Sequence, residues 1–299
     1  MSDTAHPIRE IHTDGPFAGA EGWWAEHELP ARIVYWGIHA ACLLVFVVGV
    51  SPGLLLLLAA TFFVRMFGIT GGYHRYFAHK SYKTGRVFQF LLAALASSAT
   101  QKGPLWWAGH HRGHHKYADQ PGKDVHSPAD GFYYAHQGWI FDRRWDKTPT
   151  AQIREFSRYP ELVWLNRWYP VPPALLALAL FLIGGLPALV WGFVVSTVLL
   201  WHTTYAINSI CHIWGRRVYD TPDTSRNNWL FGLLALGEGW HNNHHFYCAS
   251  VRQGFRWWEI DVTYYVLKGL EKLGLVWDLR EPPAHVVNSG ARRDLAKAA

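Results

Sequence analysis

Two stretches of the chain repeat the histidine pattern HxxHH. One is "HRGHH", which begins at His111, and the other is "HNNHH", which begins at His241. Successive residues of an α-helix are turned by about 100°, so positions i, i+3 and i+4 fall within an arc of about 100° and point to one place. Because histidine is the commonest side-chain metal ligand, each stretch predicts three ligands of a metal site.

Two further stretches add candidates beside apolar segments. In "GYHRYFAH", His74 and His79 are five positions apart, a spacing that does not share one face of an α-helix, so we expect the chain to bend after His74. In "NSICH", Asn208 and His212 are four positions apart and share a face. The candidate set is nine imidazoles and one amide: His74, His79, His111, His114, His115, His212, His241, His244, His245 and Asn208.

The first pattern has an adjacent alternative, because His110 precedes His111. With His111, the three rings fit an arc of about 100°, whereas with His110 they spread over about 140°. The spacing therefore favours His111 as the ligand.

This number of imidazoles exceeds the needs of one metal ion. A catalytic zinc takes about three protein ligands and a structural zinc four, and the motif HExxH is absent. The set would supply two metals, and imidazole suits iron, zinc and copper, whereas magnesium and calcium prefer oxygen. Ligating histidines usually donate their second ring nitrogen to a carboxylate. We interpret His126 and His136 as supporting residues, and the carboxylate candidates are Asp119, Asp124, Asp130 and Glu238.

Four apolar segments must hold these clusters in place. Residues 33–50, 54–73, 171–184 and 186–210 read as transmembrane helices. The uncharged turns "SPG" and "GGLP" pair them into two hairpins. Lysine and arginine lie almost wholly outside these hairpins, so the positive-inside rule places both termini and the histidines in the cytoplasm. Arg65 interrupts the second segment, and we expect its side chain to snorkel to the cytoplasmic surface.

The composition agrees with a membrane setting. The chain has 299 residues, 17 of them Trp, and a formal net charge of +6, which suits contact with anionic lipid headgroups. The basic residues are dispersed among acids, which argues against nucleic-acid binding. Three cysteines without a CxxC motif are expected to be reduced thiols.

The motifs "HRYFAH", "HRGHH", "NSICH" and "HNNHH", in this order around two apolar hairpins, resemble the histidine boxes of the membrane fatty acid desaturases, the stearoyl-CoA desaturase and cyanobacterial acyl-lipid group. The resemblance covers residues 33–279. It implies an all-α integral membrane fold, with four transmembrane helices in two hairpins and a cytoplasmic helical cap that holds a di-iron centre. The implied parts are a cytoplasmic arm (1–32), a desaturase domain (33–283) whose cap comprises 74–170 and 211–283, and a polar tail (284–299).

The same resemblance implies a site and an activity. The nine histidines would ligate two irons, and Asn208 would hold a metal-bound water. The expected reaction is O2-dependent introduction of a cis double bond, at the delta-9 position, into a saturated acyl chain. Electrons would come from a ferredoxin or a b-type cytochrome with its reductase, at the cytoplasmic side of a bacterial inner membrane. Candidates for an apolar tunnel that holds the acyl chain bent are Trp106, Trp107 and Trp201.

One box departs from the animal acyl-CoA branch. That branch reads WARDHRAHH, and its Arg and Asp help to hold the CoA headgroup. Here the stretch is "WAGHHRGHH", with Gly109 and His110 at those positions. The acyl carrier is therefore open among CoA, a glycerolipid and acyl carrier protein, and we expect weaker dependence on CoA.

Two other functions are alternatives to desaturation for a chain with these histidine clusters. Hydroxylation of a fatty acid or an alkane would use the same scaffold and ligands, and the sequence discriminates poorly between the two oxidations. A membrane metal transporter or sensor would carry its ligands inside the spans. The histidine clusters flank the spans instead, which favours an enzyme.

Overall fold

A computed structural model describes residues 28–289 of the chain, and these residues are mostly helical. The α-helices of these residues are α1 (Glu28–Ala41), α2 (Val45–Val48), α3 (Pro52–Phe67), α4 (Arg86–Ser97), α5 (Pro104–Tyr117), α6 (Phe132–His136), α7 (Arg154–Ser157), α8 (Pro160–Arg167), α9 (Val171–Leu189), α10 (Ser196–Ile213), α11 (Trp229–Leu234), α12 (His241–Phe246) and α13 (Val262–Lys272). The structure differs from the expected all-α fold by one small sheet, in which β1 (Lys83–Thr84) pairs antiparallel with β2 (Val276–Trp277).

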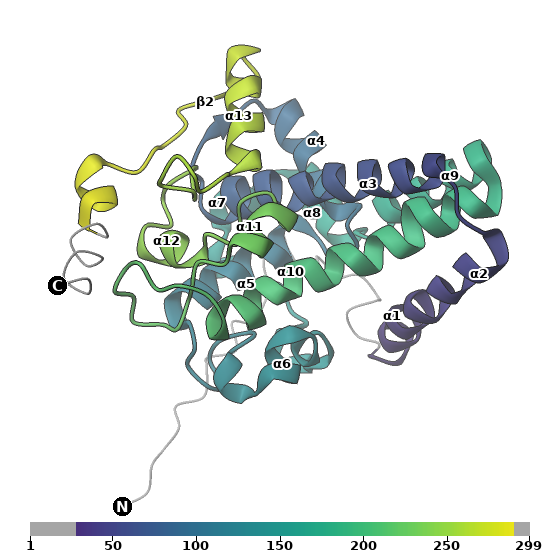
Figure 1. Ribbon diagram of the computed structural model, residues 1–299, viewed down its shortest axis with the longest axis horizontal. Helices are drawn as coiled ribbons and strands as arrows, with labels where there is room; N and C mark the ends of the chain where they lie inside the picture. The colour runs from purple at the N-terminus through teal and green to yellow at the C-terminus, as the bar shows by residue number, and fades with distance from the viewer. Residues whose placement is uncertain (1–27, 290–299) are drawn as a thin grey trace, which may run out of the picture.

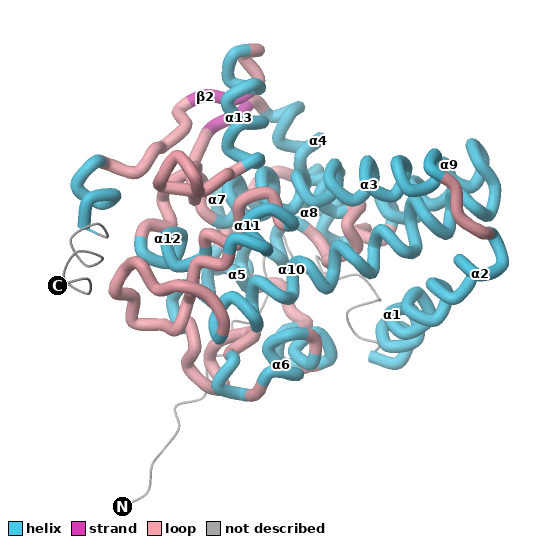
Figure 2. Tube along the Cα trace, in the orientation of Figure 1, coloured by secondary structure: helices cyan, strands magenta, loops and turns pink. Residues whose placement is uncertain are grey.

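The long helices gather at one end of the molecule. Figure 1 shows α3, α9 and α10 running toward this end, with α1 and α2 beside them, while α5, α7, α11, α12 and α13 occupy the other end. Most of the loops lie among these shorter helices (Figure 2). The outer faces of the long helices are apolar and uncovered: Leu56 in α3 is 73% exposed and Ile183 in α9 is 85% exposed. Two helical stretches, Pro52–Ala78 and Val171–Ile213, are long and apolar enough to cross a membrane.

The expected turns lie between helices. Gly49, with φ of 69°, ends α2 before Pro52 begins α3. The stretch Val171–Ile213 is interrupted at Gly184 and Gly185, where Gly185 adopts φ of 63° and the backbone leaves the helical conformation. The indole Nε1 of Trp191 donates to the carbonyl oxygen of Gly49 at 2.8 Å. Both turns therefore lie at the same end of the molecule.

Arg65 does not reach a surface. Its side chain lies inside the bundle, and the residue is only 1% exposed. The guanidinium donates to the backbone oxygens of Thr61 and Ser98 and to the hydroxyls of Ser196 and Thr197. The expectation that it snorkels is wrong, because these buried oxygens provide acceptors within the bundle.

A π-helix, and not the expected bend, brings His74 and His79 onto the same face. After Phe67 the helix continues as η3 (Gly68–Ala78), a π-helix. The backbone N–H of His79 donates to the carbonyl oxygen of His74 at 3.1 Å, a bond across five positions. Such i→i+5 bonds place residues five apart one above the other, so both histidines lie on one face. Gly68 permits close packing here, since a Cβ on it would lie 2.8 Å from the backbone nitrogen of Ala96.

The two terminal predictions fall largely outside the described residues. Residues 1–27 of the arm and 290–299 of the tail are not described, and α1 begins at Glu28, before the predicted start at 33. Within the predicted tail, residues 284–289 are helical. Val286 is buried there against Val218, Tyr219 and Phe255, so this part of the tail packs on the cap. Within the described range all three cysteines are free thiols.

Candidate metal centre and adjoining pocket

The nine candidate imidazoles lie in two groups within the cap. One group has five members, which come from η3 and its C-terminal end, α5 and α12: His74, His79, His111, His115 and His244. The other has four, from α5, α10 and α12: His114, His212, His241 and His245. In each group one ring nitrogen per residue lies within 4.8 Å of the others. The two HxxHH patterns therefore contribute to both groups.

The nitrogens that face one another are the Nε2 atoms. In the first group, the Nε2 of His244 lies 3.0 Å from that of His74 and 2.9 Å from that of His115. In the second, the Nε2 atoms of His212 and His241 are 3.0 Å apart. Two nitrogens bound at about 2.1 Å to one metal, at right angles, would lie about 3.0 Å apart. These separations therefore suit shared metal coordination.

The opposite ring nitrogens of several of these histidines contact carboxylates. The Nδ1 of His74 lies 2.5 Å from Glu238, that of His114 lies 2.8 Å from Asp124, and that of His212 lies 3.0 Å from Asp119. Such contacts fix the ring orientation of a ligand. Three of the four carboxylates considered from the sequence thus contact the histidine cluster.

Asp130 does not contact the cluster. It accepts a hydrogen bond from the backbone N–H of Gly122 at 3.2 Å. The fourth carboxylate partner is Asp223, which lies 2.9 Å from the Nδ1 of His245. Asp223 is not among the carboxylates predicted from the sequence, because it has no fixed spacing to any histidine box. The one signal for it in the sequence is its position between "NSICH" and "HNNHH".

Burial favours the neutral form of five rings of the cluster. It lowers the pKa of His79, His111, His115, His241 and His244 well below the usual range, and neighbouring imidazoles lower it further. A neutral imidazole is the form that binds a metal.

The carboxylates remain ionised in spite of their burial. Burial acts to raise the pKa of Asp119, but the hydrogen bond with His212 and the charge of that ring lower it to about 2. The pKa of Asp223 is likewise lowered by His245 against the effect of burial. Imidazole nitrogens with anionic carboxylates behind some of the rings form a donor set that suits a cation.

The side chains of His110 and His111, which are adjacent in α5, point in different directions. His111 belongs to the five-membered group, whereas the Nε2 of His110 lies 2.8 Å from the carbonyl oxygen of Trp145. Burial and the charge of Lys102 lower the pKa of His110 to about 3. Gly109 lies against Pro149, whose Cγ would be 2.6 Å from an added Cβ. Both positions that depart from the animal box are therefore tightly packed.

Helix α12 is short and is held by asparagines of its own motif. The side-chain oxygen of Asn227 accepts from the backbone N–H groups of Asn242 and Asn243 at 2.9 and 3.1 Å. The side-chain oxygen of Asn242 accepts from the backbone of Val218 and Tyr219 at 2.8 and 2.6 Å. The bonds to Asn227 satisfy backbone groups at the helix start, which lack partners within the helix, and those of Asn242 tie the helix to Val218 and Tyr219. Asn227 and Asn242 therefore fix the position of α12 and its histidines.

A second buried network holds Glu238. Arg75 donates to Glu238 at 3.1 Å and to Asp261 at 2.9 Å. The amide of Gln253 donates to the second carboxylate oxygen of Glu238 at 2.9 Å. All four side chains are buried. Glu238 is thus held toward His74 by Arg75 and Gln253.

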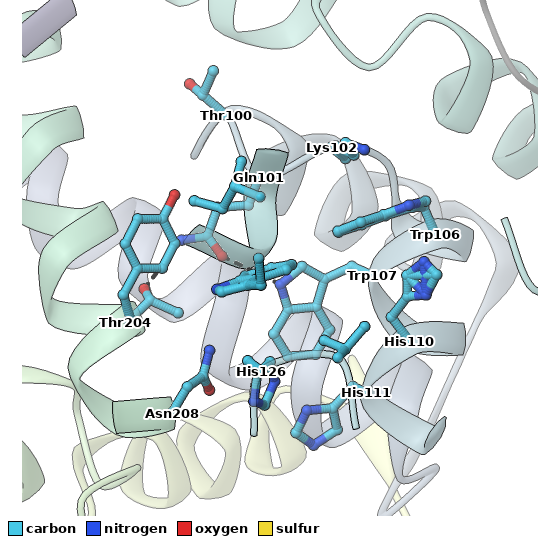
Figure 3. A pocket seen from close by; sticks show the side chains of 14 residues that line it. Thr100, Gln101, Lys102, Trp106, Trp107, His110, His111, His126, Thr204 and Asn208 are labelled. Carbon is cyan, nitrogen blue, oxygen red and sulfur yellow. Dashed lines mark hydrogen bonds between the residues drawn. The ribbon is translucent and has the colours of Figure 1, made fainter. Parts of the chain in front are cut away.

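A pocket adjoins the cluster (Figure 3). It is lined by α5, the loop before it, α10 and the segment after α6, and His111 and Asn208 lie at the same end of it. Trp106 and Trp107 line this pocket, as expected of tunnel residues, whereas Trp201 does not. The amide of Gln101 links two walls, since its oxygen accepts from Trp107 at 3.2 Å and its nitrogen donates to Thr204 at 3.1 Å.

The remaining histidines have separate positions. His126 is buried and lines the pocket, with its ring centroid 4.3 Å from that of His114. His136 lies 2.9 Å from the hydroxyl of Ser209 and 2.9 Å from His202. His202 in turn lies 3.0 Å from His39. His136, His202 and His39 thus join α6, α10 and α1, away from the cluster.

Comparisons with known proteins identify relatives of the chain. A sequence model described as fatty acid desaturase matches residues 50–278. The chain is 39% identical to a palmitoyl-monogalactosyldiacylglycerol delta-7 desaturase of Arabidopsis thaliana, over 73% of this chain and 59% of that protein. It is 36% identical to an acyl-CoA 5-desaturase of Anemone leveillei, over 87% and 81% of the two chains. It is also 36% identical to the sn-2 palmitoyl-lipid 9-desaturase of Nostoc sp. (strain 36), over 87% and 93%. The chain therefore spans less than two thirds of the first relative and most of the other two.

Proposed function

Because the chain belongs to the fatty acid desaturase family, whose members are oxidoreductases, we propose that it introduces a cis double bond at the delta-9 position of a saturated acyl chain. The relatives named above are delta-7, delta-5 and delta-9 desaturases. The Nostoc protein, which the chain covers over 93% of its length, supports delta-9 among these positions.

Two irons are the cofactor that we propose for the site. The observation that carries this proposal is the division of nine imidazoles into groups of five and four. Such a nitrogen-rich set suits a first-row transition metal and not magnesium or calcium. When bound, a pair of irons supplies the O2-dependent oxidation that removes hydrogens from an unactivated methylene pair. The ligands would be the nine histidines, with Asn208 holding a metal-bound water.

The pocket residues would position the acyl chain. Trp106 and Trp107 offer aromatic walls, and Gln101 ties Trp107 to Thr204 across the pocket. A chain bent against this bridge would present one methylene pair to His111 and its group. Orientation of this kind is what the protein contributes when a cofactor performs the oxidation.

We propose a multi-pass arrangement with the cluster at the cytoplasmic side of a bacterial inner membrane. The stretch Val171–Ile213 has 43 residues, about twice the length that crosses a bilayer, and it breaks at Gly184 and Gly185. It therefore suits two spans, and α1–α2 and α3 supply the other two. Electrons would arrive from a cytoplasmic ferredoxin or b-type cytochrome with its reductase.

Expression in a desaturase-deficient bacterium tests the function. We expect gas chromatography of total fatty acids to show a new cis-monounsaturated acid in cells that carry the wild-type chain. The His111→Ala variant, expressed to the same level, should give none. A hydroxylated product, or no new product from the wild type, would contradict the desaturase proposal.

A further inference from the structure

Arg65 is a buried cation whose neighbours are neutral. Its side chain lies in α3, within an apolar helical stretch, and all its hydrogen-bond acceptors are neutral oxygens, from Thr61, Ser98, Ser196 and Thr197. The guanidinium also lies 5.6 Å from the ring centroid of Phe193. A charge in such a place is expensive to bury and by default marks a functional position. The residues that accept its hydrogen bonds indicate what that function is.

One acceptor belongs to a strained loop between α4 and α5. This loop, residues 98–102, contains Thr100 with φ of 62° and Lys102 with φ of 61°. Residues other than glycine rarely adopt positive φ, and a β-branched residue such as threonine does so least readily. Strained backbone of this kind persists only where the surrounding structure holds it.

Three buried side chains hold the loop through its carbonyl oxygens. Arg65 donates to Ser98 at 3.3 Å, from α3. Trp201, from α10, donates to Ala99 at 3.1 Å and to Thr100 at 3.2 Å. Tyr73, from η3, donates to Lys102 at 2.9 Å. The carbonyls at four of the five loop positions thus accept a hydrogen bond from a side chain of another helix.

The loop is also a wall of the pocket. Thr100, Gln101 and Lys102 all line it, on the side facing Thr204 and Trp107 (Figure 3). Gln101 makes the bridge between those two residues, so its position depends on the backbone of the loop. A shift of the loop would therefore change where a bound acyl chain can bend.

We propose that Arg65 is a positioning residue that sets the site of desaturation by holding the strained 98–102 loop, and with it Gln101, against the pocket. Trp201 acts in the same way from α10, which gives this tryptophan a role outside the pocket lining. Arg65 does not line the pocket, and none of its hydrogen bonds goes to a candidate metal ligand. The inference rests on the proposed function, because it concerns the place of the double bond.

The test compares Arg65→Gln with wild type in two measurements. In total fatty acids, we expect the share of product with a displaced double bond to rise severalfold, and turnover to fall by about tenfold or more, since a displacement of about 1 Å can reduce rates a hundredfold. Iron content should stay at the wild-type value. Hydrogen–deuterium exchange of the peptide that covers residues 98–107 should become faster, and this measurement needs no turnover.

A second substitution separates positioning from general destabilisation. Glycine adopts positive φ without strain, so Thr100→Gly should restore the product distribution of Arg65→Gln toward wild type. A merely destabilising effect would not be corrected in this way. Arg167→Gln is the matched control, because Arg167 is an exposed arginine near the end of α8. It should leave product and exchange unchanged.

An iron-loaded Arg65→Gln protein with wild-type products and wild-type hydrogen–deuterium exchange would overturn the inference. So would failure of Thr100→Gly to alter the product distribution of Arg65→Gln. If Arg65→Gln does not fold, Trp201→Phe, which removes one indole N–H donor, carries the same expectations. A wild type without any unsaturated product would refute the proposed function, and the exchange measurement would still decide whether Arg65 holds the loop.

Discussion

In four of the candidate ligands the two ring nitrogens have separate tasks. The Nε2 atoms approach one another at about 3 Å, as the pair of His212 and His241 shows, while the Nδ1 atoms of His74, His114, His212 and His245 contact carboxylates. A carboxylate on the far nitrogen fixes the tautomer and raises the basicity of the ring. His110 belongs to neither group of imidazoles, so it should be dispensable for metal binding.

The adjacent pair in α5 gives the sharpest test of the ligand assignment. His111→Ala removes one of five imidazoles from its group, so we expect loss of iron and of essentially all activity. His110→Ala removes a ring that lies against the carbonyl oxygen of Trp145, so both irons should remain. Iron analysis and product yield of the two purified variants decide the matter. Loss of iron in His110→Ala with retention in His111→Ala would show that the assignment is wrong.

The carboxylate partners offer a second matched pair. Asp223→Asn takes a negative charge from His245 and should weaken iron binding by about ten- to a hundredfold, as loss of such a partner typically does. Asp130→Asn changes a residue that contacts the backbone of Gly122, so its iron affinity should equal that of wild type. Competition with a chelator measures both affinities. Equal affinities in the two variants would contradict the role of Asp223.

Spacing along one helix was sufficient to select the candidate ligands, and contacts between helices were not predictable. His111, His114 and His115 share a helix, so the pitch of the helix determines which faces meet the metals. Asp223 contacts His245 from a loop, 22 positions away. Trp201 was expected in the pocket for its size and apolarity, but its indole N–H bonds to Ala99 and Thr100 instead. Contacts of this kind depend on the packing of helices and loops, which a single sequence does not reveal.

At the scale of elements, hydropathy predicted the helices better than it predicted their internal geometry. The turns expected at 51–53 and 184–187 lie beside breaks at Gly49 and Gly184–Gly185. The π-helix η3 was not foreseen, because sequence periodicity assumes the α-helical turn of about 100° per residue. It matters, since only the wider turn places His74 and His79 on one face.

The hairpins predict a topology that reporter fusions can check. Both turns are uncharged and lie together, as the bond from Trp191 to Gly49 shows. Fusions at Pro52 and at Gly185 should therefore report the periplasmic side, and a fusion at the C-terminus should report the cytoplasm. The positive-inside rule gives this direction, because the basic residues flank the histidine clusters. A cytoplasmic signal at either turn would exclude the four-span topology.

For the whole molecule, the proposed O2-dependent oxidation requires a supply of electrons. The described residues provide two groups of imidazoles, and the described cysteines are unpaired and not clustered. We expect two irons per chain at full activity, and activity only with O2 and an external electron donor. Metal analysis and turnover under anaerobic conditions check this. Anaerobic turnover, or full activity with a single iron, would contradict it; zinc in a protein made in a foreign host would be mis-metallation.

The preference of the whole molecule for one acyl carrier is predicted here from two positions. Where the animal branch has an arginine and an aspartate, this chain has Gly109 against Pro149 and His110 against Trp145. Neither offers a charge to a CoA headgroup, since burial and the charge of Lys102 lower the pKa of His110 to about 3 and leave the ring neutral. Relatives include proteins named as acyl-CoA desaturases and as acyl-lipid desaturases.

We therefore expect the enzyme to depend less on CoA than the animal branch does. Purified protein with its electron donors, offered an acyl-CoA and a phospholipid that carries the same chain, should desaturate the phospholipid at least as well. A membrane-resident substrate also agrees with the uncovered apolar faces of the long helices, where Leu56 and Ile183 are exposed. A strong preference for acyl-CoA would mean that cationic residues other than the two replaced positions bind the headgroup.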